Sequence, residues 1–142
     1  MRLVDVYESL GAGEFLYRLL AERPSGANIS HATMPSLEKH LRFVEGRPYR
    51  LWLMIESDDG ERLGAIYATD RNEIGIFVAA AHQRQGHAAT ALRLFMSEHE
   101  PLPAIASVRA GRWLANIAPG NEASIALFRG LGFAKIQETY AR

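Results

Sequence analysis

Three apolar runs separated by short turns constrain the fold of this chain most. The runs are YRLWLMIES (49–57), RLGAIYAT (62–69) and EIGIFVA (73–79), and they are joined by DDGE and DRN. Runs rich in β-branched and aromatic residues, bounded by Asp, Asn and Gly, are typical of strands connected by tight turns. We therefore expect an antiparallel meander over residues 49–79.

Strand-like and helix-like segments alternate through the rest of the chain. Further strands are expected at 2–8, 112–118 and 133–140, and helices at 14–22, 35–45, 85–98 and from the turn PGN to Gly130 or Gly132. Pro35 suits a first helical position, residues 24–35 should form a loop, and the prolines of 100–111 argue against a regular helix there. The pattern predicts a single α/β domain over residues 1–142, with a mixed, mostly antiparallel central sheet flanked by helices.

Charge and composition exclude several classes of protein. Sixteen basic and sixteen acidic side chains balance, which argues against a protein built to coat nucleic acid or an anionic membrane. The absence of cysteine excludes disulfides, thiolate nucleophiles and zinc-thiolate sites, and the five histidines show no metal-ligand spacing. The N-terminus MRLVDVYESL lacks the features of a signal peptide, and no apolar run approaches the roughly 20 residues of a membrane span. A cytoplasmic protein without a metal is expected.

The stretch HQRQGHAATAL (82–92) starts a helix without the usual cap. A helix start normally carries Ser, Thr, Asp or Asn, because these side chains satisfy the free backbone N–H groups. Here a Gln-Arg-Gln-Gly turn runs into an alanine-rich helix with no acidic residue in its first two turns. Uncapped N–H groups and the positive end of the helix dipole bind phosphate, and Gly86 lets a bulky anion approach. An ordinary loop-to-helix junction is the alternative.

Two motifs resemble those of the GNAT superfamily of N-acetyltransferases. QRQGHA (83–88) is similar to the Gln/Arg-x-x-Gly-x-Gly/Ala signature that cradles the pyrophosphate of acetyl-coenzyme A in that family. NEASIALFRGLGF (121–133) is similar to the second family signature, and the order of elements fits from residue 2 to residue 140. The motif style resembles ribosomal-protein N-terminal acetyltransferases.

The resemblance implies the GNAT fold and transfer of an acetyl group from acetyl-coenzyme A, without a metal, to an amine of a small molecule or peptide. It implies these coenzyme-binding residues: Phe77, Val78, Gln83, Arg84, Gln85, Gly86, His87, Ala88, Asn121, Ser124 and Phe128. Two alternatives stay open. One is a coenzyme-binding regulatory module without catalysis, and the other is a transferase of the same fold that uses another acyl group or a nucleobase acceptor.

Three residues are candidates for the chemistry. Glu73 opens a strand that lines the cleft in this family and is the candidate base, acting through water; the alternative is an exposed turn residue. Asn116 stands where some relatives carry a glutamate and could orient a water or the substrate. Phe128 stands where many members carry a tyrosine that reprotonates the thiolate, and Ser124, one turn earlier on the same helix face, is the candidate substitute.

The end of the chain departs from the family, which normally has one more strand after the one that begins at Gly-Phe. Only Ala141 and Arg142 follow Tyr140, so the sheet is expected to lack its last strand. We expect residues 133–140 to pair in parallel with residues 112–118 of the same chain. Pairing or exchange of these strands between two protomers, giving a homodimer, is the alternative. In this family the loop that contains His31 walls the acceptor site. Trp52 and Tyr67 are expected to be core or sheet-face residues, and contact with the substrate is the alternative.

Overall fold

Four strands form one antiparallel sheet. The computed structural model describes residues 1–24 and 33–142, so His31 and most of the predicted loop 24–35 lie outside the described residues. Strands β1 (Arg2–Asp5), β2 (Leu51–Glu56), β3 (Arg62–Ala68) and β4 (Ile74–Val78) lie in the order β1-β2-β3-β4, and each neighbouring pair is antiparallel. The predicted meander is confirmed, because its three apolar runs became β2, β3 and β4.

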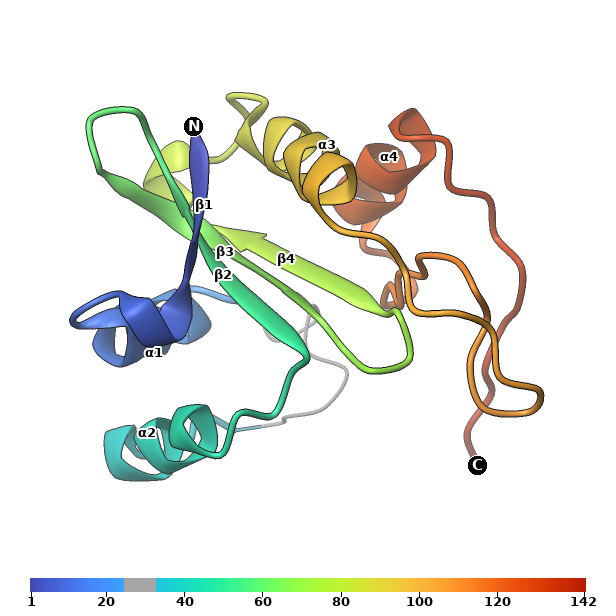
Figure 1. Ribbon diagram of the computed structural model, residues 1–142, viewed down its shortest axis with the longest axis horizontal. Coiled ribbons are helices and arrows are strands. Elements are labelled where there is room, and N and C mark those ends of the chain that lie inside the picture. The colour runs from blue at the N-terminus through green and yellow to red at the C-terminus, as the bar shows by residue number, and fades with distance from the viewer. Residues whose placement is uncertain (25–32) are drawn as a thin grey trace.

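Helices cover both faces of this sheet (Figure 1). One face carries α1 (Ala12–Ala21) and α2 (Leu37–Glu45), and the other carries α3 (His87–Glu98) and α4 (Glu122–Gly130). In the described part of the chain, the short 3-10 helices η1 (Val6–Glu8) and η3 (Ala80–His82) follow β1 and β4. This arrangement confirms the expected α/β architecture of a central sheet flanked by helices.

Alternation along the strands builds a separate core on each face. Leu53 and Ile55 of β2 pack with the α3 and α4 side, whereas Trp52 and Met54 pack with the α1 and α2 side. Successive side chains of a strand point to opposite faces, so one strand serves both cores. The core under α3 contains the fully buried Phe95 and Leu92.

The start of α2 differs from the prediction. Ser36 is the N-cap, and its hydroxyl accepts the backbone N–H of Lys39 at 3.3 Å, so the helix begins at Leu37 and Pro35 lies before it. The physical reason is that the serine hydroxyl satisfies one of the free N–H groups at the helix start. Pro35 therefore is not the first helical residue.

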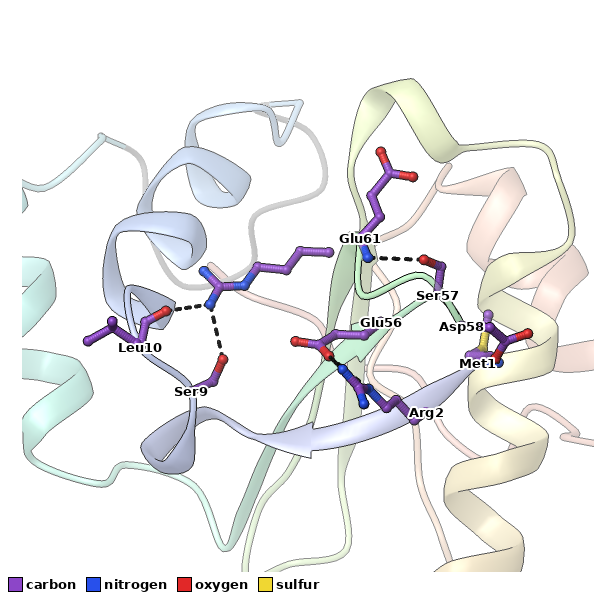
Figure 2. Close-up of polar contacts among 9 residues, drawn as sticks. Met1, Arg2, Ser9, Leu10, Glu56, Ser57, Asp58 and Glu61 are labelled. Carbon is purple, nitrogen blue, oxygen red and sulfur yellow. Dashed lines mark hydrogen bonds and ion pairs between the residues drawn. The ribbon is translucent and has the colours of Figure 1, made fainter.

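Arginine side chains fasten the N-terminal strand and the turn after it (Figure 2). Arg2 donates through Nε (3.0 Å) and Nη2 (2.8 Å) to one carboxylate oxygen, Oε2, of Glu56 on β2. Arg62 donates to the hydroxyl of Ser9 at 3.1 Å and to the carbonyl of Leu10. These contacts hold β1, an edge strand of 4 residues, and the entry to α1 against the β2–β3 hairpin.

The predicted strand 112–118 is almost entirely wrong. Its only ladder contact among residues 1–24 and 33–142 is a single parallel bridge between Leu114 and Glu73. The N–H of Ile74 donates to the carbonyl of Leu114 at 2.8 Å, and the N–H of Leu114 donates to the carbonyl of Asn72 at 2.9 Å. In the part of the chain that the structure describes, residues 115–118 make no backbone hydrogen bond to β4. The two segments meet at this bridge, which is the only parallel pairing in the described sheet, and then part.

The predicted strand 133–140 is also wrong, and so is its expected pairing with 112–118. The described chain has no strand there, and Ile136 (58% exposed) and Tyr140 (86% exposed) face solvent. A strand needs a partner with free backbone groups in register, and residues 115–118 form no strand that could serve as one. The expectation that the sheet lacks its last strand agrees with the structure. Pairing between two protomers stays a prediction.

Asn72 holds the long connection after α3 against the β3–β4 turn. Its side chain is fully buried; Nδ2 donates to the carbonyls of Leu102 (2.9 Å) and Ala110 (2.8 Å), and Oδ1 accepts the N–H of Leu102 at 2.7 Å. Its backbone φ is +63°, in the left-handed region that asparagine tolerates better than most residues. With its bond to Leu114, one residue fixes three points of the segment 102–114.

We expect Asn72→Ala to destabilise the protein strongly. The change leaves buried backbone groups of Leu102 and Ala110 without partners, each at about 1–3 kcal/mol, and places alanine at a positive φ. A loss of about 3 kcal/mol or more in the free energy of unfolding, measured by urea denaturation, is expected. Asn116→Ala, at an exposed asparagine, is the matched control and should change stability by less than about 0.5 kcal/mol. Equal losses in both variants would contradict the role given to Asn72.

Candidate functional site

Strand β4 has one paired edge and one open edge. The carbonyl of Glu73 accepts the N–H of Thr69 at 3.0 Å, so the odd-numbered residues of this strand direct their backbone groups at β3. The even-numbered residues direct theirs away from β3, and Ile74 uses its N–H on Leu114. Within residues 1–24 and 33–142, the N–H and C=O of Ile76 have no hydrogen-bond partner. An extended chain with amide groups could bind along this edge.

The open edge of β4 leads to the uncapped start of α3. Gly86 is the N-cap at φ +81°, no side chain caps the helix, and its first turn contains no acidic residue. The first N–H bonded within the turn is that of Thr90, to the carbonyl of Gly86 at 3.1 Å. The N–H groups of His87, Ala88 and Ala89 have no hydrogen-bond acceptor in the described chain. The predicted free helix start is confirmed, and its chemistry suits a phosphate.

The two glutamines of QRQG build this turn with their side chains. Nε2 of Gln83 donates to the carbonyl of Val78 at 2.9 Å, and Nε2 of Gln85 donates to the carbonyl of Ala81 at 3.1 Å. Arg84, between them, is exposed and has a φ of +60°. The glutamine amides therefore shape the turn, while the backbone N–H groups and the Arg84 guanidinium remain free to bind an anion.

Two histidines flank the turn. Nε2 of His82 lies 3.4 Å from Oε1 of Glu61, and the rings of His82 and His87 meet edge to face at 6.4 Å. His87 is the first residue of α3 and is half-buried. Val78, by contrast, is buried in the core under α3, so what it presents to the open edge is its backbone N–H.

Glu73 lies at the far end of β4 from the phosphate turn, beside the Leu114 bridge. Its carboxylate accepts a hydrogen bond from the hydroxyl of Thr69 at 3.1 Å, and the same hydroxyl accepts the N–H of Glu73 at 3.2 Å. The side chain is half-buried. It shares its strand face with Phe77, which packs on the α1 and α2 side. A carboxylate thus stands at the point where β4 and residues 115–118 part.

The second motif forms the start of α4. Oδ1 of Asn121 accepts the N–H of Ser124 at 3.2 Å, so Asn121 caps the helix. The hydroxyl of Ser124 has no partner in the described part of the chain. Phe128 is 5% exposed and packs edge to face on Phe133 at 5.1 Å. The phenyl ring is therefore a core residue, and Ser124 is the polar group on that side of the helix.

Asn116 is exposed and lies two residues past the Leu114 bridge. Two extended residues span about 7 Å, which keeps Asn116 in the neighbourhood of the bridge but off β4. Its side chain has no hydrogen-bond partner among the described residues. The site therefore brings Glu73 and the Asn116 segment to one apex and the phosphate turn to the opposite end of β4.

Sequence reasoning missed two features of this site. Asn72 was read only as part of the DRN turn, although it fixes Leu114 beside Glu73. The aromatic ring of Tyr67, from β3, lies across Gly75 of β4. A glycine inside an apolar strand was the available signal, because such a glycine often marks the close approach of another group.

A separate hollow of about 570 Å³ lies between the η1–α1 turn and α2. Its lining contains none of the candidate site residues on β4, α3 and α4, so the site on β4 rests on backbone geometry and not on that hollow. In residues 1–24 and 33–142, no group of three His, Cys, Asp or Glu is placed to hold a metal ion. Across the same residues, none of the helices has the length and apolar character that a bilayer span needs.

Comparison with known families gives a match over most of the chain. The model of the acetyltransferase (GNAT) domain matches residues 17–134. No curated protein sequence shows significant similarity to the chain.

Several solved structures share the fold. The spermidine N-acetyltransferase from Vibrio cholerae, solved with CoA and spermine, is 15% identical with a TM-score of 0.73, over 91% of this chain and 79% of that one. The ribosomal-protein-alanine N-acetyltransferase from Brucella melitensis is 22% identical with a TM-score of 0.67, over 96% and 85%. The phosphinothricin acetyltransferase from Sinorhizobium meliloti, solved with acetyl-CoA, is 23% identical with a TM-score of 0.61, over 92% and 73%. At these identities the likeness shows the fold.

We expect Gly86→Val to weaken binding of acetyl-coenzyme A while the fold remains. A Cβ on Gly86 would meet no protein atom within 4 Å, so the new side chain would project into the space in front of the free N–H groups. Gly132→Val is the matched control, since Gly132 also has open space and a φ of +87°. Both variants should lose about 1–2 kcal/mol of stability from the positive φ. In calorimetric titration, only Gly86→Val should weaken binding, by about tenfold or more; equal affinities would contradict a phosphate site here.

Proposed function

Because this chain belongs to the GNAT acetyltransferase family, we propose that it transfers the acetyl group of acetyl-coenzyme A directly to an amine, with residues 1–142 acting as one domain. The observation that carries the proposal is the open edge of β4, which runs from the apex at Glu73 to the uncapped start of α3. An edge of free amide groups that ends on a phosphate-binding helix start suits a ligand with a pyrophosphate at one end and amide groups along its length.

In this proposal the main chain does most of the coenzyme binding. The free N–H groups at the start of α3, with Arg84 and His87 beside them, receive the pyrophosphate. The pantetheine amides bind along β4 to the C=O of Ile76 and the N–H of Val78, which point away from β3 and are unpaired in the described chain. Asn121 and Ser124 contact the arm from α4, while Phe77 and Phe128 contribute apolar contact. Gln83 and Gln85 act by holding the turn in shape.

The chemistry needs a base, and we assign it to Glu73. An acceptor amine is mostly protonated near neutral pH, since a lysine side chain has a reference pKa of about 10.4 and a chain terminus of about 8. The Glu73 carboxylate takes this proton through a water, which Asn116 orients, so that the free amine can attack the thioester. The Thr69 hydroxyl fixes one oxygen of the carboxylate and leaves the other for the water. The Ser124 hydroxyl donates to the departing thiolate, since Phe128 has no hydroxyl to give.

The acceptor is an amine of a small molecule or a peptide. The solved relatives include enzymes named for spermidine, phosphinothricin and a ribosomal-protein alanine, and these span both classes. A regulatory module that binds the coenzyme without catalysis is the second candidate, and the phenylalanine at position 128 is the observation that favours it.

One experiment separates the two candidates. Release of free thiol from acetyl-coenzyme A is followed with spermidine, phosphinothricin and a peptide with an N-terminal alanine as acceptors. Turnover with at least one amine above the rate of hydrolysis is the expected result. Thermal stabilisation by acetyl-coenzyme A without turnover of any amine would support the regulatory module and contradict the transferase.

We expect Glu73→Gln to lower kcat at pH 7 by about a hundredfold, in the range typical of general-base catalysis. Raising the pH supplies free amine without the base, so the rate of the variant should recover in part at pH 9. The affinity for acetyl-coenzyme A should stay the same. Asp70→Asn, at an exposed carboxylate in the same turn, is the matched control and should behave as the wild type. A Glu73→Gln profile that follows the wild type at every pH would leave Glu73 as a turn residue.

A further inference from the structure

The phenol of Tyr67 occupies the place that a side chain of β4 would normally take. A Cβ built on Gly75 would lie 2.2 Å from Cζ of Tyr67 and 2.4 Å from its hydroxyl oxygen. Only glycine fits at position 75, because the tip of Tyr67 from the neighbouring strand lies directly over its Cα. Tyr67 is half-buried, so this phenol is not sealed inside the core.

Tyr49 holds Tyr67 in this position. The two rings stack with centroids 4.0 Å apart and planes 14° apart. Burial raises the pKa of Tyr49 to about 12, and the neighbouring Tyr67 and a hydrogen bond to its side chain act in the same direction. The Tyr67 phenol is therefore held between the ring of Tyr49 on one side and the backbone of Gly75 on the other.

Two hydrogen-bond donors, one from β4 and one from β3, lie next to each other at Gly75. The N–H of Ile76 directly follows Gly75 and faces the open edge. The O–H of Tyr67 lies over Gly75 on the sheet face that also carries Glu73. A backbone donor and a side-chain donor on the same side of a strand can converge on one oxygen atom, as an oxyanion requires.

We propose that the hydroxyl of Tyr67 and the N–H of Ile76 together bind the thioester oxygen during acetyl transfer, an assignment that rests on the proposed function. The amine nitrogen attacks the carbonyl carbon, a C–N bond forms, and the carbonyl π electrons move to the oxygen, which the two donors stabilise. The intermediate collapses when the C–S bond breaks and its electron pair leaves on the sulfur. One ammonium proton goes to Glu73 through water before the attack, and the proton that the nitrogen loses as the amide forms passes to the departing thiolate by way of the Ser124 hydroxyl. The products are an amide and the free thiol of coenzyme A.

The test uses Tyr67→Phe, which keeps the ring and its stacking on Tyr49 but removes the hydroxyl. Tyr7→Phe is the matched control, because the Tyr7 hydroxyl donates to the carbonyl of Val44 at 2.8 Å, away from β4. The infrared carbonyl band of bound, carbonyl-¹³C acetyl-coenzyme A is compared among the three proteins, together with kcat and KM for the fastest amine of the panel. The band reports hydrogen bonding to the thioester oxygen, and it can be measured without an acceptor amine.

We expect the band to lie below that of free acetyl-coenzyme A in the wild type and in Tyr7→Phe, and to move back toward the free value in Tyr67→Phe. The kcat of Tyr67→Phe should fall by about 10²-fold, as for the loss of one oxyanion donor, with KM for the amine unchanged. A band and kcat equal to the wild type would overturn the assignment, and so would a raised KM for the amine with an unchanged band. A band shift that depends on Tyr67 in a protein without amine turnover would support the assignment and contradict the proposed transferase.

Discussion

The parallel bridge between Glu73 and Leu114 is the contact on which the rest of the site depends. It joins β4 to the segment after α3 at one point only, so that the remainder of β4 keeps a free edge. Asn72 makes that point stable, since its buried amide ties Leu102 and Ala110 to the same turn. Without this anchor, Leu114 would not be held beside Glu73, and the open edge of β4 would have no defined apex.

Much of this architecture could be predicted from the sequence, because its signals are local. Turn residues between apolar runs gave the meander of β2 to β4. The absence of a capping residue before His87 gave the free start of α3, and Asn121 caps α4 as its residue type favours. These features depend on neighbours within a few positions, so the chain alone specifies them.

The errors fall where a residue depends on distant partners. Residues 112–118 and 133–140 have strand-like composition, but strand formation requires a partner in register, and the bridge at Leu114 is the only such contact in the described chain. The role of Asn72 depends on a segment about 30 residues away. The role of Tyr67 depends on the pairing of β3 with β4. No local pattern could have shown that Gly75 is small because a phenol from β3 covers it.

The open edge of β4 and the uncapped helix start have a consequence for divergence. Both present backbone amides, and a backbone amide survives every substitution except proline. Lineages could therefore replace most side chains around this region without losing it, which agrees with a shared fold at 15% to 23% identity. The sheet face that carries Glu73 and Tyr67 works through side chains instead, so a substitution there changes the chemical groups of the site while the backbone edge stays the same. The edge of β4 and the start of α3 therefore depend on the course of the main chain, whereas the chemistry beside them depends on the identity of a few side chains.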